Sequence, residues 1–172
     1  MDLLKLMYKR RSVRDFEATD ITDEDLNKLL QAALLAPTSR NKHPCYFIVV
    51  SNKELLRKLS QCKNTGAEPL AECNKAIVVI ANETVSDTWI EDSSIALTYL
   101  HLMATELDLG SCWIQIHLRD KYGKDSEKLV CETLEIDDSH RVVGIMAIGI
   151  PKSIPEPRTL EDLDQNKVHF YN

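Results

Sequence analysis

The clearest pattern along the chain is a repeat of apolar residues at intervals of three and four between Leu26 and Leu34. This spacing places the apolar side chains on one face of a helix. Thr22 with Asp25 three residues later is a typical helix start, and Pro37 ends the pattern. The sequence therefore predicts a well-defined amphipathic helix between Thr22 and Pro37.

Other segments carry weaker helical signals. We expect a short amphipathic helix over 3–9, a helix capped by Asn52 that runs through Leu59, a long helix over about 85–108, and a further helix over 126–134. The long helix is apolar on nearly all sides between residues 95 and 104, so we expect it in the middle of the molecule.

Four apolar runs rich in β-branched or aromatic residues predict buried strands at 46–50, 76–81, 112–116 and 141–150. The run at 76–81 is apolar on both faces, which is typical of a central strand. Helices and strands alternate without a linker or a repeat, so we expect residues 1–172 to form a single domain. The segment 151–172 has little periodicity and an aromatic end, and we expect it to lie against another subunit.

Composition narrows the function. A chain of 172 residues and 19.6 kDa is the size of one domain, and its 44 % hydrophobic content is enough for a core. It carries 21 basic and 27 acidic residues, a net charge of −6, which disfavours nucleic-acid binding. No apolar run is long enough for a membrane span, and five cysteines without a C-x-x-C pair are typical of reduced thiols. We expect a cytoplasmic protein without a metal site.

The scarcity of glycine bears on phosphate binding. The chain has 5 glycines and no G-x-G-x-x-G or P-loop motif. A bound nucleotide would therefore depend on side chains for its phosphate.

The run Arg10-Arg11-Ser12-Val13-Arg14 offers such side chains. Guanidinium groups form paired hydrogen bonds with phosphate. From this segment alone, a solvated basic patch is an equally good interpretation. The polar loop 36–44 offers hydroxyl and amide groups near a strand, although such a loop is more often only a turn.

Taken together, these segments resemble the FMN-dependent nitroreductases. The resemblance rests on R-x-S-x-R-x-F at Arg10 to Phe16, A-P-T-S-x-N at Ala36 to Asn41, the helix motif from Asp92 to Ala104, L-G-S-C-W at Leu109 to Trp113, and I-G-I-P at Ile148 to Pro151. The motifs occur in this order along nearly the whole chain.

The resemblance implies the site residues. Arg10, Arg11 and Ser12 would bind the FMN phosphate and ribityl chain, and Arg14 would lie near N1 and the C2 carbonyl of the isoalloxazine ring. Pro37, Thr38, Ser39 and Asn41 would line and hydrogen-bond the ring. Lys167 resembles a basic residue that closes on the phosphate. No side chain is assigned a catalytic role, because flavin N5 carries the chemistry.

It also implies a fold and an activity. We expect an α+β fold with a mixed central β-sheet flanked by helices, in a homodimer that exchanges the C-terminal extension 151–172. FMN would take a hydride from NADH or NADPH and pass it to a small-molecule acceptor, such as a nitroaromatic or a quinone, by a ping-pong mechanism. The alternative is a non-catalytic flavin- or nucleotide-binding sensor or carrier.

Overall fold

The structure, a computed structural model, describes residues 2–171. Their helices are α1 (Leu3–Lys9), α2 (Asp23–Leu34), η1 (Ser39–Asn41), α3 (Lys53–Leu59), α4 (Pro69–Glu72), α5 (Trp89–Glu106), α6 (Ser126–Leu134), η2 (Leu160–Asp162) and η3 (Gln165–Lys167), where η denotes a 3-10 helix. Their strands are β1 (Cys45–Val50), β2 (Lys75–Ala81), β3 (Gly110–Gln115), β4 (Asp120–Lys121), β5 (Lys124–Asp125) and β6 (Arg141–Gly149).

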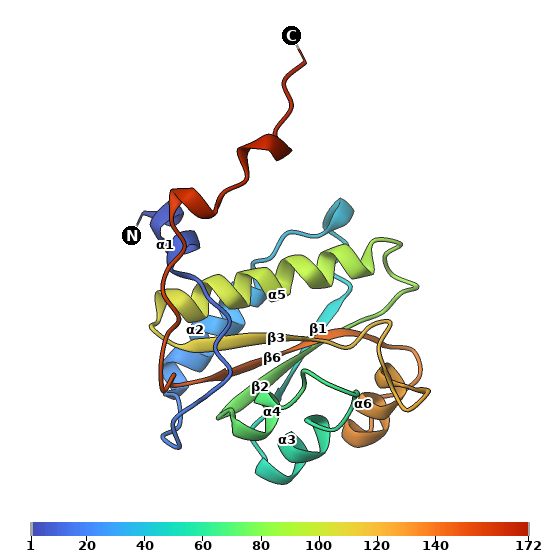
Figure 1. Ribbon diagram of the computed structural model, residues 1–172. Coiled ribbons are helices and arrows are strands. Elements are labelled where there is room, and N and C mark those ends of the chain that lie inside the picture. The colour runs from blue at the N-terminus through green and yellow to red at the C-terminus, as the bar shows by residue number, and fades with distance from the viewer. Residues whose placement is uncertain (1, 172) are drawn as a thin grey trace.

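The main sheet has the strand order β1-β2-β6-β3, and each neighbouring pair is antiparallel (Figure 1). The parallel component is an isolated bridge between Ser12 and Ser111, which extends the sheet beyond β3. All seven residues of β2 are buried, which confirms the prediction of a central strand at 76–81. The α+β class expected from the sequence is confirmed, with helices on both faces of the sheet.

The two faces of the sheet support separate cores. Ile77 and Val79 of β2 pack with α2 and α5, whereas Val78 and Ile80 pack with α3, α4 and α6 (Figure 1). This division follows from the two-residue period of a strand, which sends alternate side chains to opposite faces. The sheet is therefore the middle layer of three.

α5 is shorter at its start than the sequence indicates. The prediction was a helix from about residue 85, but the chain before Trp89 forms a turn in which Asn82 Oδ1 accepts hydrogen bonds from the backbone and side chain of Thr84. The sheet side of α5 is buried. Its other side carries Tyr99, which is 38 % exposed, so only one side of this helix occupies the interior of the chain.

The C-terminal segment leaves the body after β6. Residues 152–171 are exposed, and Figure 1 shows the segment passing α1 and then extending away from the sheet. Its described contact with α1 includes the Arg158 amide, which donates to the Tyr8 carbonyl at 2.9 Å. Across residues 2–171, we find no helix with the length and hydropathy needed to traverse a membrane.

Candidate functional site

The segment after α1 is fixed along the edge of β3. The Val13 amide donates to the Ser111 carbonyl at 2.9 Å, next to the Ser12–Ser111 bridge. Val13 and Phe16 are buried in the core, whereas Arg14 between them is exposed. Because apolar side chains anchor this segment, its arginines have a fixed backbone from which to reach a ligand.

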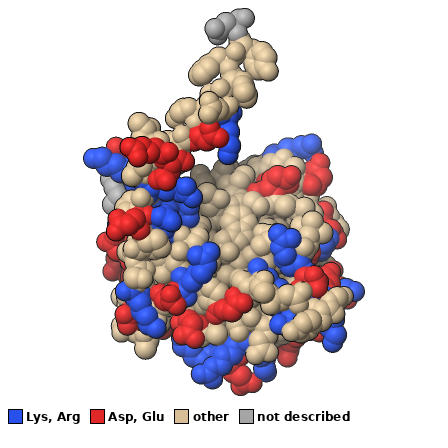
Figure 2. All heavy atoms as spheres, in the orientation of Figure 1, with Lys and Arg blue, Asp and Glu red and all other residues tan. Residues whose placement is uncertain are grey.

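Three guanidinium groups gather beside this segment. The pKa of Arg10 lies below its ordinary value, first because of burial and then because of the positive charges of Arg158 and Arg11. Arg11 Nη1 donates to the Glu156 carbonyl on the tail. Figure 2 shows basic side chains gathered where the projecting tail leaves the body.

No described carboxylate forms an ion pair with Arg10, Arg11, Arg14 or Arg158; the ion pairs within residues 2–171 involve other basic residues. The Asp162 carboxylate on the tail interacts with the charges of Arg158 and Arg11 but forms no ion pair with them. Like charges that are held together without a direct ion pair favour an anion. The donor set, guanidinium groups with the Ser12 hydroxyl on the same segment, matches the chemistry of a phosphate ester. These residues therefore fit the phosphate end of a flavin nucleotide.

A buried histidine lies behind this cluster. His101 of α5 is 7 % exposed, and its Nε2 is 3.4 Å from Arg10 Nη1. Its Nδ1 is 2.6 Å from Ser111 Oγ. Burial, followed by the positive charge of Arg10, lowers the pKa of His101 to about 4, so the ring is neutral at neutral pH.

The second predicted group of site residues lies in the loop after α2. The Ser39 amide donates to Asp92 Oδ1 at 2.8 Å, and the His43 amide donates to Thr38 Oγ1 at 3.0 Å. Arg40, Asn41 and His43 have φ values of 50°, 55° and 48°. Such left-handed conformations are unfavourable for residues with a side chain, and they are concentrated at binding sites.

Asp92 holds this loop in place. Its side chain is buried, at 1 % exposure for the residue, and Oδ2 accepts from Ser86 Oγ at 3.1 Å and Thr88 Oγ1 at 3.3 Å. With the Ser39 amide on Oδ1, the carboxylate joins the loop to the start of α5. The backbone of the loop is therefore fixed before any ligand binds.

The structure brings the predicted residues together in two groups. Arg10, Arg11 and Ser12 lie near the end of α5, whereas Thr38, Ser39 and Asn41, with exposed Pro37, lie near its start (Figure 1). Nine residues of helix separate Asp92 from His101, about 13 Å at 1.5 Å per residue. Within the described chain, the two groups do not form one continuous site.

The tail contributes Arg158 to the first group, a residue that the sequence analysis missed. Lys167 is the tail residue that the sequence analysis expects at the phosphate. It lies in η3, in the part of the tail that extends from the body (Figure 1). Its role stays a prediction. His101 and Asp92 were also missed as site residues, although Asp92 belongs to the helix motif quoted above.

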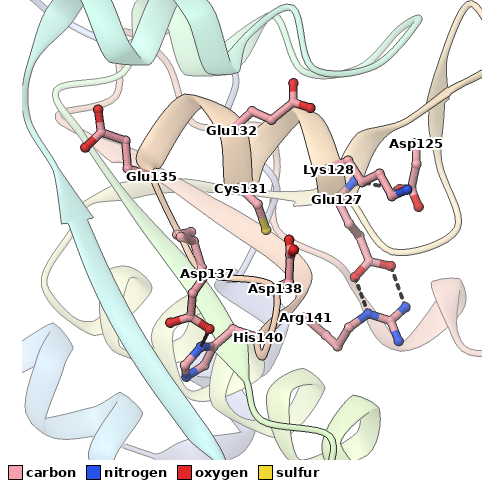
Figure 3. Close-up of a pocket in the computed structure, with 11 residues that line it drawn as sticks. Asp125, Glu127, Lys128, Cys131, Glu132, Glu135, Asp137, Asp138, His140 and Arg141 are labelled. Carbon is pink, nitrogen blue, oxygen red and sulfur yellow. Dashed lines mark hydrogen bonds and ion pairs between the residues drawn. The ribbon is translucent and has the colours of Figure 1, made fainter.

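A larger cavity, of about 790 Å³, lies elsewhere in the described chain, between α6 and β6. Figure 3 shows the carboxylates that line it and the pairing of Glu127 with Arg141, whose Nε and Nη2 donate to the Glu127 oxygens at 3.0 and 3.1 Å. His117 Nδ1 is 2.6 Å from Glu127 Oε1. Across the described chain, no group of three or more His, Cys, Asp or Glu side chains is arranged to hold a metal ion. Because its lining is mostly acidic and Arg141 is already paired with Glu127 and Glu83, this cavity is less suited to a phosphate than the arginine cluster.

Comparisons with known proteins identify the family of this chain. The model of the nitroreductase family matches residues 7–79 and 63–150. An Archaeoglobus fulgidus protein named as an NADH dehydrogenase/NAD(P)H nitroreductase is 36 % identical over 155 residues, which cover 88 % of this chain and 86 % of the relative.

Two solved structures extend the similarity to the fold. An FMN-dependent nitroreductase from Clostridium difficile is 41 % identical, with a TM-score of 0.95, and the match covers 98 % of this chain and 99 % of that one. A protein from Parabacteroides distasonis, named as an NADH dehydrogenase/NAD(P)H nitroreductase, is 25 % identical with a TM-score of 0.91, and the match covers 100 % and 99 % of the two chains.

Proposed function

Because the chain belongs to the nitroreductase family, we propose that it is an FMN-dependent NAD(P)H oxidoreductase that reduces a small acceptor such as a nitroaromatic or a quinone. The observation that carries this proposal is the cluster of Arg10, Arg11 and Arg158, none of which forms an ion pair with a carboxylate among the described residues. The names of the similar proteins from Archaeoglobus fulgidus and Clostridium difficile support the same chemistry.

Each group of side chains has its own role in this proposal. Arg10, Arg11 and Ser12, together with Arg158, bind the phosphate and ribityl chain of FMN. Arg14 lies near N1 and the C2 carbonyl of the ring. Its fixed positive charge stabilises the negative charge that reduction leaves on that side.

When bound, FMN supplies the hydride chemistry at N5, first from NADH or NADPH and then to the acceptor, in a ping-pong sequence. The chain orients the flavin and stabilises its reduced form. His101 beside Arg10 has a pKa of about 4, because of burial and then the charge of Arg10, and acts as a neutral hydrogen-bonding partner.

The second half of the site comes from another copy of the chain in a homodimer. Pro37, Thr38, Ser39 and Asn41 of that copy line the flavin ring. This arrangement follows from the separation of the two groups along α5, and it turns the exposed side of that helix toward the partner. Lys167 joins the phosphate site from the tail.

The apolar surface supports this assembly. A groove of about 470 Å³ between α1, α2 and α5 is lined by apolar side chains including Leu3, Met7 and Tyr99. Leu34, the last residue of α2, and the adjoining Leu35 are 67 % and 76 % exposed. Exposed apolar surface of this kind is typical of a protein interface.

In the same dimer, residues 1–172 form one domain and the extension 151–172 wraps the partner. It pairs with β1, which is the open edge of the partner's sheet, because segment 10–16 already covers the β3 edge. The five cysteines are all free, which supports a reducing compartment such as the cytoplasm.

One absorption experiment tests the function. The purified protein is expected to be yellow, to bleach with NADH or NADPH, and to recover its colour when menadione or a nitroarene is added. A protein that binds FMN without steady-state oxidation of NAD(P)H would be the sensor or carrier of the alternative interpretation. A protein that binds no FMN would contradict the proposed function.

A further inference from the structure

The side chain of His101 connects the candidate phosphate site to the core. Its ring lies between Arg10 Nη1, 3.4 Å from Nε2, and Ser111 Oγ, 2.6 Å from Nδ1. Since a guanidinium group has only donors, Nε2 must be the acceptor, and Nδ1 carries the proton that is donated to the serine hydroxyl. The low pKa of His101 agrees with a neutral ring.

A neutral acceptor has a specific advantage at this position. The positive charges of Arg158 and Arg11 repel the Arg10 guanidinium, so without a partner it would turn toward solvent. A carboxylate would hold it but would compete with phosphate for its charge. The imidazole fixes the direction of the guanidinium and leaves its full charge for an anion.

Ser111 links the ring to the backbone that carries the arginine. Its hydroxyl receives the Nδ1 proton of His101, while its carbonyl accepts the Val13 amide at 2.9 Å. The same residue of β3 therefore fixes both the ring that contacts the guanidinium and the chain segment from which Arg10 extends.

We propose that His101 is a positioning residue that holds the Arg10 guanidinium toward the FMN phosphate, with Ser111 fixing the imidazole ring. This inference rests on the proposed function, because it requires that Arg10 binds the phosphate. It predicts that His101 affects the affinity for FMN but not the affinity for riboflavin, which lacks the phosphate.

Two substitutions distinguish the contact made by Nε2 from the contact made by Nδ1. In His101→Gln the amide oxygen can occupy the position of Nε2 and accept from Arg10. In His101→Asn the shorter side chain reaches only as far as Nδ1, and it can contact Ser111 but not Arg10. Each variant is loaded with FMN or with riboflavin, and the fluorescence of released flavin on dilution gives the two Kd values.

We expect His101→Asn to raise the Kd for FMN about tenfold, the size of a lost hydrogen bond to a charged group, with the Kd for riboflavin unchanged. His101→Gln should stay within about twofold of the wild type. In an Arg10→Ala background, His101→Asn should cause no further loss. Ser111→Ala, a second and milder variant, should raise the Kd for FMN alone.

Equal losses of FMN and riboflavin in His101→Asn, or an unchanged Kd for FMN, would overturn the inference. So would a loss in His101→Gln as large as that in His101→Asn. A wild type that binds FMN no better than riboflavin would instead contradict the proposed phosphate site itself. If Arg10→Ala removes the preference for FMN and His101→Asn retains it, only the role of His101 is wrong.

Discussion

The buried imidazole of His101 should make the stability of this protein depend on pH. The pKa of His101 is about 4 in the folded chain, whereas an ordinary histidine has a pKa of about 6.5. Below pH 6.5 the unfolded chain therefore binds a proton that the folded chain does not. The free energy of unfolding should fall by up to about 3 kcal/mol between pH 6.5 and pH 4.

Urea unfolding at several pH values checks this prediction. His101→Gln cannot titrate, so its free energy of unfolding should depend less on pH over the same interval. A variant with the same pH dependence as the wild type would show that other groups are responsible.

The exposed Arg14 gives a second prediction at this scale. Replacing it with glutamine removes the fixed charge proposed for the N1 side of the flavin, so Arg14→Gln should lower the reduction potential by tens of millivolts, where about 30 mV corresponds to 1.4 kcal/mol. Spectroelectrochemical titration of the FMN-loaded protein measures this change. Arg57→Gln, in α3 on the opposite face of the sheet, is the control and should leave the potential unchanged.

Candidate site residues could be selected from the sequence where a short motif carries them, and their roles stay predictions. Arg10, Ser12 and Ser39 are recognisable from the order of residues in two motifs. His101 and Arg158 contact or approach Arg10 from positions far along the chain; His101 is 91 residues away. No local sequence pattern indicates a contact between residues so far apart in the chain. His101 and Arg158 could therefore be identified as partners of Arg10 only from the folded structure.

At the scale of elements, the packing of segment 10–16 against β3 depends on a glycine. A Cβ atom at Gly110 would lie 2.8 Å from Val13 Cγ1 and 3.1 Å from Pro151 Cβ. Gly110→Ala should therefore displace the arginine segment, lower the free energy of unfolding by about 1–3 kcal/mol and weaken FMN binding.

A compensating substitution makes this prediction specific. Val13→Ala removes the atom nearest to the added methyl group, so the double variant should be more stable than the sum of the two single effects predicts. Thermal and urea unfolding of the wild type, the two single variants and the double variant completes this double-mutant cycle. Additive effects would mean that the contact between Gly110 and Val13 does not position the segment.

Elements were predictable where the periodicity is long enough to be distinct. The helix after Thr22 and the buried strand at 76–81 are confirmed because their patterns extend over a full face or a full run. α4 has only four residues, Pro69–Glu72, too few to establish a helical period. The β4–β5 hairpin has only two residues on each strand, so it too was not predicted from the sequence.

At the scale of the whole molecule, the proposed dimer depends on the apolar side of α1 and α5. Tyr99→Glu introduces a charge into the groove between these helices, so it should produce monomers that bind FMN weakly. Sedimentation velocity measures the assembly and absorbance measures the flavin. Leu118→Glu is the matched control, since Leu118 is 78 % exposed and does not line the groove.

The extension offers a complementary test. Removal of residues 153–172 should give an aggregated or flavin-free protein, because the deletion takes away Arg158 and the segment proposed to cover the β1 edge. A monodisperse monomer that retains FMN would contradict the exchange. The path of this extension was not predictable from periodicity, since its apolar residues, such as Leu160 and Phe170, are exposed and form no periodic face.

The projecting C-terminal segment should make the stability of the protein depend on its concentration. If each subunit completes its neighbour, the folded state is reached by a bimolecular step, and dilution favours the incomplete chains. The melting temperature should then rise with protein concentration. The fraction of subunits that bind FMN at a fixed excess of FMN should rise in the same way.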